Sequence, residues 1–340
     1  MPSEQPTPGK LVLIHLSDIH LFHDEINGSQ DIDADIRKKL AADIKEQLKQ
    51  IGRNADGILV SGDISFASAE SEFSAAYAWL QDLAAVAGCK HNRIWMIPGN
   101  HDAAWAAMSP VLLDVHEAIR ATNQADRLRE RLNDASTAMS LLGPFQRYNV
   151  LARKFACATE PSATFWESDE LILNDGSVLR IRGLNSALVS DRRDNALGKP
   201  AQVMGHKQVQ LSDDDDGVAY LTMSHHPPDY FFDKKLVEDH LHSRARVQLY
   251  GHEHTHRAYK HKNSVLVFAG ALHPDRGEEG WEPRYNLLAL EVHSEAGKRT
   301  LHVELYPRVW HETAKFVAQR DDQERYGCSS FMTMTTTNPV

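Results

Sequence analysis

KLVLIHLSDIH, residues 10–20, joins a short apolar run to polar side chains that follow it directly. An apolar run of this length predicts a buried β-strand. The same combination of apolar run and polar end recurs in GILVSGD, residues 57–63, and in RIWMIPGNHD, residues 93–102. These three stretches predict three strands, each of which ends in a polar turn.

Helices are predicted between these strands. Residues 31–51 carry apolar side chains at helical spacing, and residues 69–87 also have a helical pattern. The apolar positions of the first helix are Ile32, Ile36, Leu40, Ile44 and Leu48. An alternation of strand and helix is typical of right-handed βαβ units in a parallel sheet with its helices outside.

The polar residues that follow the three strands are expected to meet. They are Asp18 and His20 after the first strand, Asp63 after the second, and Asn100, His101 and Asp102 after the third. The carboxyl ends of neighbouring parallel strands face one crevice, which is where α/β sheets bind ligands. The sequence therefore predicts a site at this edge of the sheet.

The second half of the chain is richer in strand signals. Residues 171–181 (LILNDGSVLRI) predict a hairpin that turns near Asn174–Gly176, and further short apolar runs follow. These runs cover residues 218–224, 247–251, 264–270, 285–292 and 300–306. Histidines again stand at strand ends, in Ser224-His225-His226-Pro227 and in Gly251-His252-Glu253-His254. Two facing sheets with helices on both outer sides fit this order of elements.

We expect a single domain over residues 8–312. Within it, residues 103–160 are rich in Ala, Leu, Arg and Glu and predict an insertion of two or three helices. Packing is the favoured role of this insertion, and a lid over the site is the alternative. The chain from Tyr326 onward is Thr-rich and aperiodic. Residues 313–340 are therefore expected to be a C-terminal tail, partly disordered or serving as a linker.

Composition narrows the function classes. The formal net charge of −10 disfavours a broad basic surface for nucleic acid, which stays open as a partner but is not favoured. The three cysteines are widely spaced and odd in number, so they imply neither a disulfide framework nor a Cys-type zinc site. The N-terminus lacks a long apolar stretch, so we expect a cytoplasmic protein with no membrane segment.

Five short motifs occur in a fixed order along the chain. They are Asp18-Ile-His20, Gly62-Asp63, Gly99-Asn100-His101-Asp102, His225-His226-Pro227 and Gly251-His252-Glu253-His254. In this order the chain resembles the calcineurin-like metallophosphoesterase superfamily, over residues 11–256. The resemblance implies an α/β fold, a four-layer αββα sandwich of two facing mixed sheets with a helical insertion. One such motif alone would be weak, whereas five in order are specific.

The residue types of the motifs suit a metal site. Carboxylates, an amide oxygen and neutral imidazoles, without thiolates, favour divalent ions such as Mn²⁺, Fe²⁺ or Zn²⁺. The i, i+2 spacing in Asp18-x-His20 and in His252-x-His254 predicts that both side chains lie on the same side of an extended segment. The neighbouring Gly62, Gly99 and Gly251 are expected to let the backbone pass close to bound substrate.

The resemblance also implies roles for individual residues. Two divalent ions, Mn²⁺ by preference, are expected between seven metal ligands: Asp18, His20 and His254 on the first ion, Asn100, His225 and His252 on the second, and Asp63 bridging both. A metal-bound hydroxide would attack phosphorus in line. His101 would protonate the leaving oxygen or stabilise the transition-state charge. Asp102 would fix the tautomer of His101, with capping of a following helix as the alternative.

The expected substrate is a phosphodiester. Two divalent ions with Asp18, Asp63 and a hydroxide leave a net charge of about +1, which matches a monoanionic diester. The Asp-Arg pair of the related protein phosphatases is absent, because Ile64 follows Asp63, and Phe66 stands where purple acid phosphatases carry a ligating tyrosine. The segment from Ser61 to His101 resembles compact bacterial class III phosphodiesterases acting on cyclic nucleotides or glycerophosphodiesters.

Several alternatives stay open from the sequence. An arginine that reaches the cleft, from Arg192, Arg193, Arg257 or Arg276, would reverse the preference for diesters. A phosphomonoesterase or nuclease of the same superfamily is the alternative enzyme, and a non-catalytic regulatory module is the alternative class. His226 is open between contact with the site and a structural role, and Glu253 is expected to point away from the ligands.

Overall fold

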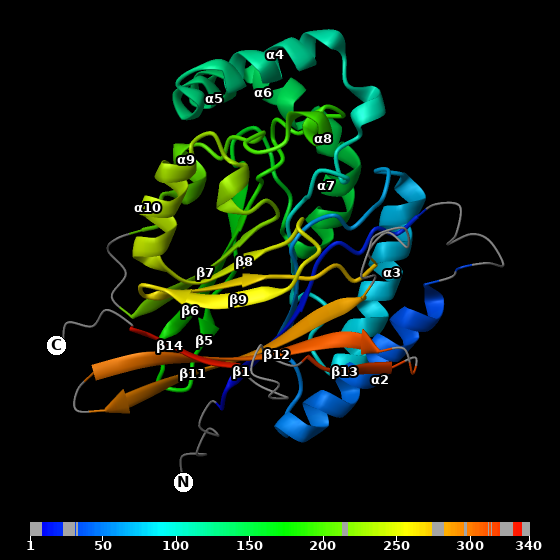
Figure 1. Cartoon of the computed structure of the whole chain (residues 1–340), viewed down its shortest axis with the longest axis vertical. Helices are drawn as coiled ribbons and strands as arrows, with labels where there is room; N and C mark the ends of the chain where they lie inside the picture. The colour runs from blue at the N-terminus through cyan, green and yellow to red at the C-terminus, as the bar shows by residue number, and fades with distance from the viewer. Residues whose placement is uncertain are drawn as a thin grey trace.

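The architecture rests on two seven-stranded mixed sheets. The computed structural model describes residues 9–22, 31, 33–212, 217–273, 282–295, 298–311, 313, 315–319 and 329–334. The chain is α/β, as the sequence predicts, and Figure 1 shows the sheets in the middle of the molecule with helices on either side. None of the described helices is long and apolar enough to cross a membrane.

The first sheet is built around the N-terminal strand β1. Its strands are β1 (Leu11–Leu16), β2 (Gly57–Val60), β3 (Ile94–Met96), β11 (Arg284–Glu295), β12 (Lys298–His311), β13 (Lys315–Ala318) and β14 (Ser329–Met334). Strands β1, β2 and β3 are parallel, and β1 also pairs with the antiparallel β11. Every residue of β1 is buried, so its continuous apolar pattern reflects cover on both faces.

The second sheet is formed by the later half of the chain. Its strands are β4 (Phe165–Glu167), β5 (Leu171–Ile172), β6 (Val178–Leu184), β7 (Val218–Ser224), β8 (Ala245–Tyr250), β9 (Arg257–His261) and β10 (Ser264–Phe268). Strands β6, β7, β8 and β10 run parallel, and β5 and β6 form the predicted hairpin. Strand β9, whose residues are mostly exposed, is an antiparallel edge that the sequence pattern missed.

Apolar packing defines the layers. The main core joins residues of both sheets, for example Leu13 and Ile58 of the first with Ile181 and Leu221 of the second, so the sheets pack face to face. Helices α2 (Ala34–Ile51) and α3 (Glu70–Ala87) flank the first sheet, and α10 (Lys234–Arg244) flanks the second (Figure 1). A smaller cluster that includes Leu184, Tyr220 and Leu241 seats α10 on its sheet.

Helix α2 illustrates why the predicted elements form. It buries Ile36, Leu40, Ile44 and Leu48, one side chain from each turn, as its amphipathic pattern predicts. Ile32, which the prediction also included, lies outside the described residues. The helix ends at Gly52, whose φ of 84° is a left-handed conformation that glycine adopts without a steric penalty.

The insertion contains more helices than predicted. Residues 103–160 form four α-helices and short 3₁₀ turns, where two or three helices were expected. The α-helices are α4 (Pro110–Ala121), α5 (Gln124–Asn133), α6 (Ala135–Leu142) and α7 (Gln146–Ala152). Helix α7 belongs to the main core, because Tyr148 is fully buried and its hydroxyl donates to the carbonyl oxygen of Met96 at 3.0 Å.

The sheet continues past the domain boundary expected at residue 312. Strands β13 and β14 both pair antiparallel with β12, and Phe316 of β13 is buried against Tyr285 and Trp310. Part of the segment predicted as a tail is therefore sheet. Its remaining residues, including most of the chain after Ala318, lie outside the described residues.

Candidate metal centre

The polar residues at the strand ends converge on one cluster. Asp18 and His20 follow β1, Asp63 follows β2, and Asn100 and His101 follow β3. His225 comes directly after β7, and His252 and His254 follow β8. The structure thus brings together side chains from both sheets, and these span residues 18–254 of the sequence.

One part of the cluster is formed by Asp18, His20 and His254, whose ligand atoms lie within 4.8 Å of one another. Nε2 of His254 is 3.4 Å from Oδ1 of Asp18, and Nε2 of His20 is 3.9 Å from the same oxygen. Asp18 is fully buried and His20 is nearly so. This group could hold one metal ion.

A second part of the cluster is centred on His225. Its Nε2 lies 3.2 Å from Oδ2 of Asp63 and 3.1 Å from Oδ1 of Asn100. His225 also groups with His252 and His226 within metal-ligand distance. Oδ2 of Asp63 is 3.9 Å from Nε2 of His20, so this carboxylate stands between the two parts of the cluster.

The backbone at these positions is left-handed rather than extended. The φ angle is 50° at Asp18, 45° at His20, 50° at Asp63, 71° at His252 and 54° at His254. The predicted extended i, i+2 arrangement is therefore wrong, although the paired side chains do converge. Positive φ is sterically costly for residues with a Cβ and is concentrated at functional sites. The chain turns sharply after each strand and directs the side chains inward.

Two glycines make room for the candidate ligands. A Cβ on Gly99 would lie 2.1 Å from Oδ1 of Asp63, and a Cβ on Gly62 would lie 2.4 Å from Nδ1 of His225. Such distances are shorter than any van der Waals contact. The glycines thus serve close packing of the ligand side chains themselves, in addition to the backbone approach expected from the sequence.

Backbone carbonyls orient two of the imidazoles. Nδ1 of His225 lies 2.9 Å from the carbonyl oxygen of Ser61, and Nδ1 of His101 lies 2.8 Å from that of Phe66. A carbonyl oxygen only accepts, so each Nδ1 carries a proton and each Nε2 is directed elsewhere. These partners could not be predicted from residue types, because every residue has a carbonyl.

Asp102 does not orient His101 as predicted. Its carboxylate accepts hydrogen bonds from the backbone N–H groups of Ile64, Ser65 and Gly99 at 2.9–3.2 Å, and another from the hydroxyl of Ser65. Within the described residues no hydrogen bond joins it to the ring of His101. Asp102 instead holds the turn after β2 against the turn after β3, and the carbonyl of Phe66 has the role expected of Asp102.

Burial and charge set the protonation states. Burial lowers the pKa of His20 to about 4 and that of His252 to about 3, so both imidazoles are neutral at pH 7. Burial acts to raise the pKa of Asp18 and Asp63. The hydrogen bond from His254 to Asp18, and the charge of His225 beside Asp63, outweigh burial and lower both pKa values. Both carboxylates are ionised.

His225 behaves differently from the other imidazoles. Burial acts to lower its pKa, but the ionised Asp63 beside it raises the pKa to about 9. His225 thus carries a proton toward the carboxylate in the metal-free protein, and a bound cation would displace that proton. Ionised carboxylates, an amide oxygen and buried neutral imidazoles are the donors that borderline divalent metals prefer, so the residues present fit such ions.

His226 and Glu253 have defined contacts. Nδ1 of His226 is 3.0 Å from the hydroxyl of Ser186, and its ring centroid lies 4.5 Å from that of His252, so His226 does contact the site. Glu253, which was expected to point away from the ligands, accepts a hydrogen bond from Lys199 at 2.6 Å and forms an ion pair with Arg257.

Two of the arginines that could have reached the cleft are paired with carboxylates. Arg193 pairs with Asp191 at 2.8 Å and with Glu117 at 3.2 Å. Arg257 pairs with Glu253 and covers the ring of Phe268 at 3.7 Å. Arg192 lines a hollow together with Trp105, whose ring centroid lies 5.4 Å from that of His101. Arg276 lies outside the described residues.

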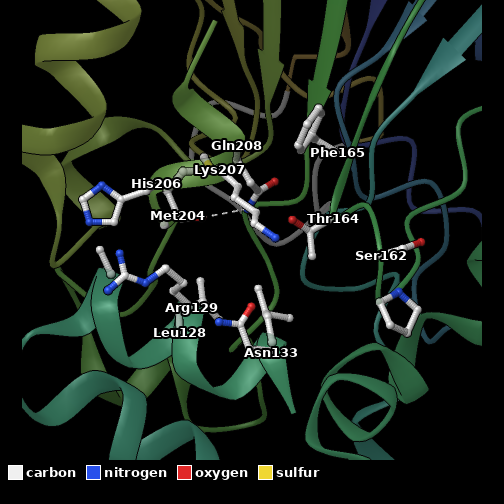
Figure 2. Close-up of a pocket in the computed structure, with 14 residues that line it drawn as sticks. Leu128, Arg129, Asn133, Ser162, Thr164, Phe165, Met204, His206, Lys207 and Gln208 are labelled. Carbon is white, nitrogen blue, oxygen red and sulfur yellow. Dashed lines mark hydrogen bonds between the residues drawn. The ribbon is translucent and has the colours of Figure 1, made fainter. Parts of the chain in front are cut away.

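Another pocket lies apart from this cluster. Figure 2 shows it between α5 and the turn that carries α9 (His206–Val209), with Leu128, Arg129 and Asn133 on one side and Lys207 on the other. Nε2 of Gln208 donates to the carbonyl oxygen of Met204 at 2.8 Å and stiffens that turn. The described residues that line this pocket include no candidate metal ligand, so it is a feature of the insertion rather than of the metal centre.

Several solved structures are similar to this chain at low sequence identity. A search of curated proteins gives no match. Among solved structures, Vps29 from Cryptosporidium parvum is 12% identical, with 95% of this chain and 98% of that chain covered and a TM-score of 0.38. GAP50, the anchor in the inner membrane complex of Plasmodium, is 8% identical over 97% and 90% of the two chains, with a TM-score of 0.47. The sulfate thiohydrolase SoxB of Thermus thermophilus is 14% identical over 89% and 58%, with a TM-score of 0.40.

The sequence itself gives the family match. The model of the calcineurin-like phosphoesterase family matches residues 11–256, which is well over half of the 340-residue chain and includes all five motifs. The family implies divalent metal ions and a phosphate-ester substrate, and the cluster of aspartates and histidines described above supplies candidate ligands. The chain belongs to the calcineurin-like phosphoesterase family.

Proposed function

We propose that the protein is a phosphodiesterase that uses two divalent metal ions. The observation that carries this proposal is the convergence of seven candidate ligands, from five separated segments, on one cluster. Degenerate sites lose ligands, whereas every ligand position of the motifs is filled here. A metal-dependent hydrolase is therefore favoured over a non-catalytic module.

The proposed ligand sets follow the two parts of the cluster. Asp18, His20 and His254 would hold the first ion, and Asn100, His225 and His252 the second. Asp63 would bridge them, since its Oδ2 approaches both His20 and His225. Two ions so held would supply Lewis acidity toward the phosphoryl oxygens and lower the pKa of bound water.

His101 is the proposed general acid. Its Nδ1 donates to the carbonyl of Phe66, and its backbone N–H donates to Oδ1 of Asp63 at 2.8 Å, so ring and backbone are both fixed. Nε2 is the atom left to act on substrate. In the imidazolium form this atom could donate a proton to the leaving oxygen, and the grouping of His101 with His20 and Asp63 supports that role.

The charge around the cleft supports a diester substrate. A dianionic monoester needs an additional cation, and bidentate arginine is the usual one. Arg193 and Arg257 are both committed to carboxylate neighbours. A monoanionic phosphodiester, such as a nucleotide diester or a glycerophosphodiester, is therefore the proposed substrate class, and Mn²⁺ is the proposed metal.

Turnover of two chromogenic esters tests this proposal. Metal-free protein would be supplied with Mn²⁺, Fe²⁺ or Zn²⁺ and assayed on bis(p-nitrophenyl) phosphate, p-nitrophenyl phosphate and single-stranded DNA. We expect the diester to be hydrolysed fastest with Mn²⁺. Preferential turnover of the monoester would replace the diester proposal by a phosphomonoesterase. Preferential turnover of DNA would keep the diester chemistry but make the protein a nuclease.

Two substitutions separate metal binding from acid catalysis. Asp63→Asn should lower the bound metal content and reduce kcat by about a thousandfold, because one bridging charge is lost. His101→Ala should retain metal and reduce kcat by roughly 10²–10⁴-fold. His91→Ala, at an exposed position, is the matched control and should change neither quantity. Full activity in Asp63→Asn, measured together with metal content, would refute the bridging role.

A further inference from the structure

A hollow of about 210 Å³ opens beside the proposed second metal position, with the candidate ligand His252 in its lining. Its lining includes His226 and His252 on the cluster side. The rest of the lining comes from Asp194, Gly198, Lys199, Ala201, Gln202 and Tyr230. A group attached to a phosphorus atom at the cluster would thus have this hollow as its nearest space on that side.

Gln202 provides a buried acceptor in this wall. Its side chain is 1% exposed, and its Nε2 donates to Oδ2 of Asp194 at 2.8 Å. That bond fixes the orientation of the amide, because a carboxylate accepts only. Among the described residues, Oε1 of Gln202 has no hydrogen-bond partner. A buried amide oxygen without a donor is destabilising, so the site is poised for a ligand that brings one.

Arg120 of the insertion fixes the same wall. Its guanidinium is nearly buried and donates from Nε to the carbonyl of Ala201 at 2.9 Å, from Nη1 to Asp191 at 3.1 Å and from Nη2 to Asp194 at 3.0 Å. Gln202 follows Ala201 in the chain and hydrogen-bonds Asp194, and Arg120 binds both of these residues. These contacts hold the wall in one conformation, and a wall that is already ordered reduces the entropic cost of binding.

The hollow has little unbalanced charge. Nζ of Lys199 lies 2.6 Å from Oε1 of Glu253 and 4.3 Å from the ring centroid of Tyr230. Glu253 is shared with Arg257, and the lining also carries the carboxylate of Asp194, so cations and carboxylates around the hollow are roughly matched. The ring of Tyr230 packs edge-on against His252, at 4.5 Å between centroids, and gives the hollow an apolar side. These features fit a neutral polar group better than a second phosphate.

We propose that this hollow is the subsite for one substituent of the phosphodiester, and that Gln202 selects a neutral substituent carrying a hydroxyl or amino donor. The inference rests on the phosphodiesterase proposal and adds the substituent that the enzyme would prefer on its substrate. The donor can come from two sources, a glycerol or a nucleoside. The hydrogen bond from the substituent to Oε1 of Gln202 is common to both.

The test compares substrates with and without a donor. Gln202→Met removes the acceptor with little change in volume, and Gln210→Met, at an exposed position nearby, is the matched control. The kcat/KM of glycerophosphoethanolamine and of 2′,3′-cyclic AMP would each be divided by that of bis(p-nitrophenyl) phosphate. We expect Gln202→Met to lower at least one of these ratios by about tenfold, mainly through KM, and Gln210→Met to leave both unchanged.

A binding measurement distinguishes failure of this inference from failure of the proposed function. By calorimetry on the metal-loaded protein, glycerol 3-phosphate or 3′-AMP should bind more tightly than inorganic phosphate, and Gln202→Met should abolish the difference. If Gln202→Met abolishes the binding preference while no diester is hydrolysed, the subsite proposal is supported and the phosphodiesterase proposal is wrong. If diesters are hydrolysed but both ratios and the binding preference are unchanged in Gln202→Met, the subsite proposal is wrong.

Discussion

At the scale of single residues, Gly99 is the position where the site has the least room for an added side chain. Its missing side chain leaves room for the carboxylate of Asp63, which an alanine Cβ would contact at 2.1 Å. Gly99→Ala should therefore displace Asp63 and its neighbour Asn100. We expect metal content, measured by elemental analysis, to fall well below that of the unsubstituted protein, and activity to fall with it.

Gly143→Ala is the control for this change. An added Cβ at Gly143 would meet no atom within 4 Å, and the backbone there is helical, with φ of −52°. Such a substitution is neutral or slightly stabilising. Equal metal content in the two variants would contradict the packing argument at Gly99.

His15 is a buried histidine that should make stability depend on pH. It is fully buried in β1, with Nε2 2.9 Å from the hydroxyl of Ser61, and burial lowers its pKa from 6.5 to about 3. The unfolded chain then binds more protons than the folded one below pH 6.5, so stability is lost as pH falls through that value. Between pH 7.5 and pH 5 the loss from this residue is about 2 kcal/mol.

The variant His15→Asn checks that contribution. Unfolding by urea, followed at pH 7.5 and pH 5, should show a smaller loss of stability on acidification than in the unsubstituted protein. The contribution of His15 is the difference between the stability losses of the two proteins, because the other buried histidines contribute equally to each loss. An identical loss would show that His15 does not titrate as its burial implies.

Residue types predicted the ligand candidates but not their surroundings. Asp, Asn and His in motifs of fixed order indicate metal chemistry from the amino-acid sequence alone. The carbonyl partners of His101 and His225 belong to the backbone and leave no mark on the sequence. Gln202 is far from every motif in the chain, and only the fold brings it beside His252.

At the scale of elements, helix α4 is tied to the segment that follows β6 (Figure 1). Arg120 is the link, and Arg120→Met would leave the half-buried Asp194 without its cation and take one cation from the fully buried Asp191. Breaking a buried pair from one side is strongly destabilising, so we expect a loss of about 3 kcal/mol in urea unfolding. Arg127→Met, which removes an exposed pair with Glu130 on α5, should cost less than about 1 kcal/mol.

Hydrogen exchange would locate the effect of the Arg120 substitution. Amides of residues 189–202 should exchange faster in Arg120→Met, because these residues lose the contacts that fix them. Unchanged protection there would show that the segment is held by its other contacts.

Elements with a continuous apolar or amphipathic pattern were predictable, and edges were not. Strands β1 and β2 and helix α2 carry patterns set by burial, and they form where expected. Strand β9 is an edge with exposed, polar residues, so no apolar alternation marks it. Strand β14 draws on a Thr-rich segment and is specified by pairing with β12, which is contact between distant residues.

At the scale of the whole molecule, the candidate ligands come from both sheets. Asp18 and Asp63 follow strands of the first sheet, and His225 and His252 follow strands of the second. Bound ions would therefore link the sheets and relieve the repulsion between two buried carboxylates. At a free concentration of 100 times Kd, one ion adds about 2.7 kcal/mol of stability.

Removal of metal should be visible in thermal unfolding. We expect dialysis against a chelator to lower Tm by about 5 °C or more, and added Mn²⁺ to restore it. The same treatment of Asp63→Asn should shift Tm much less. A Tm that does not respond to metal in either protein would contradict a centre built between the sheets.

Five candidate ligands hold left-handed backbone conformations, and this has a consequence for attempts to improve the protein. Glycine at Asp63 or His252 would relax the main chain, and at Asp63 it would also remove a buried negative charge. A screen for thermal stability alone would thus select the substitutions that remove the candidate metal ligands. Directed evolution of this scaffold should select for turnover at every round, because thermal stability and catalytic activity favour different residues at the same few positions.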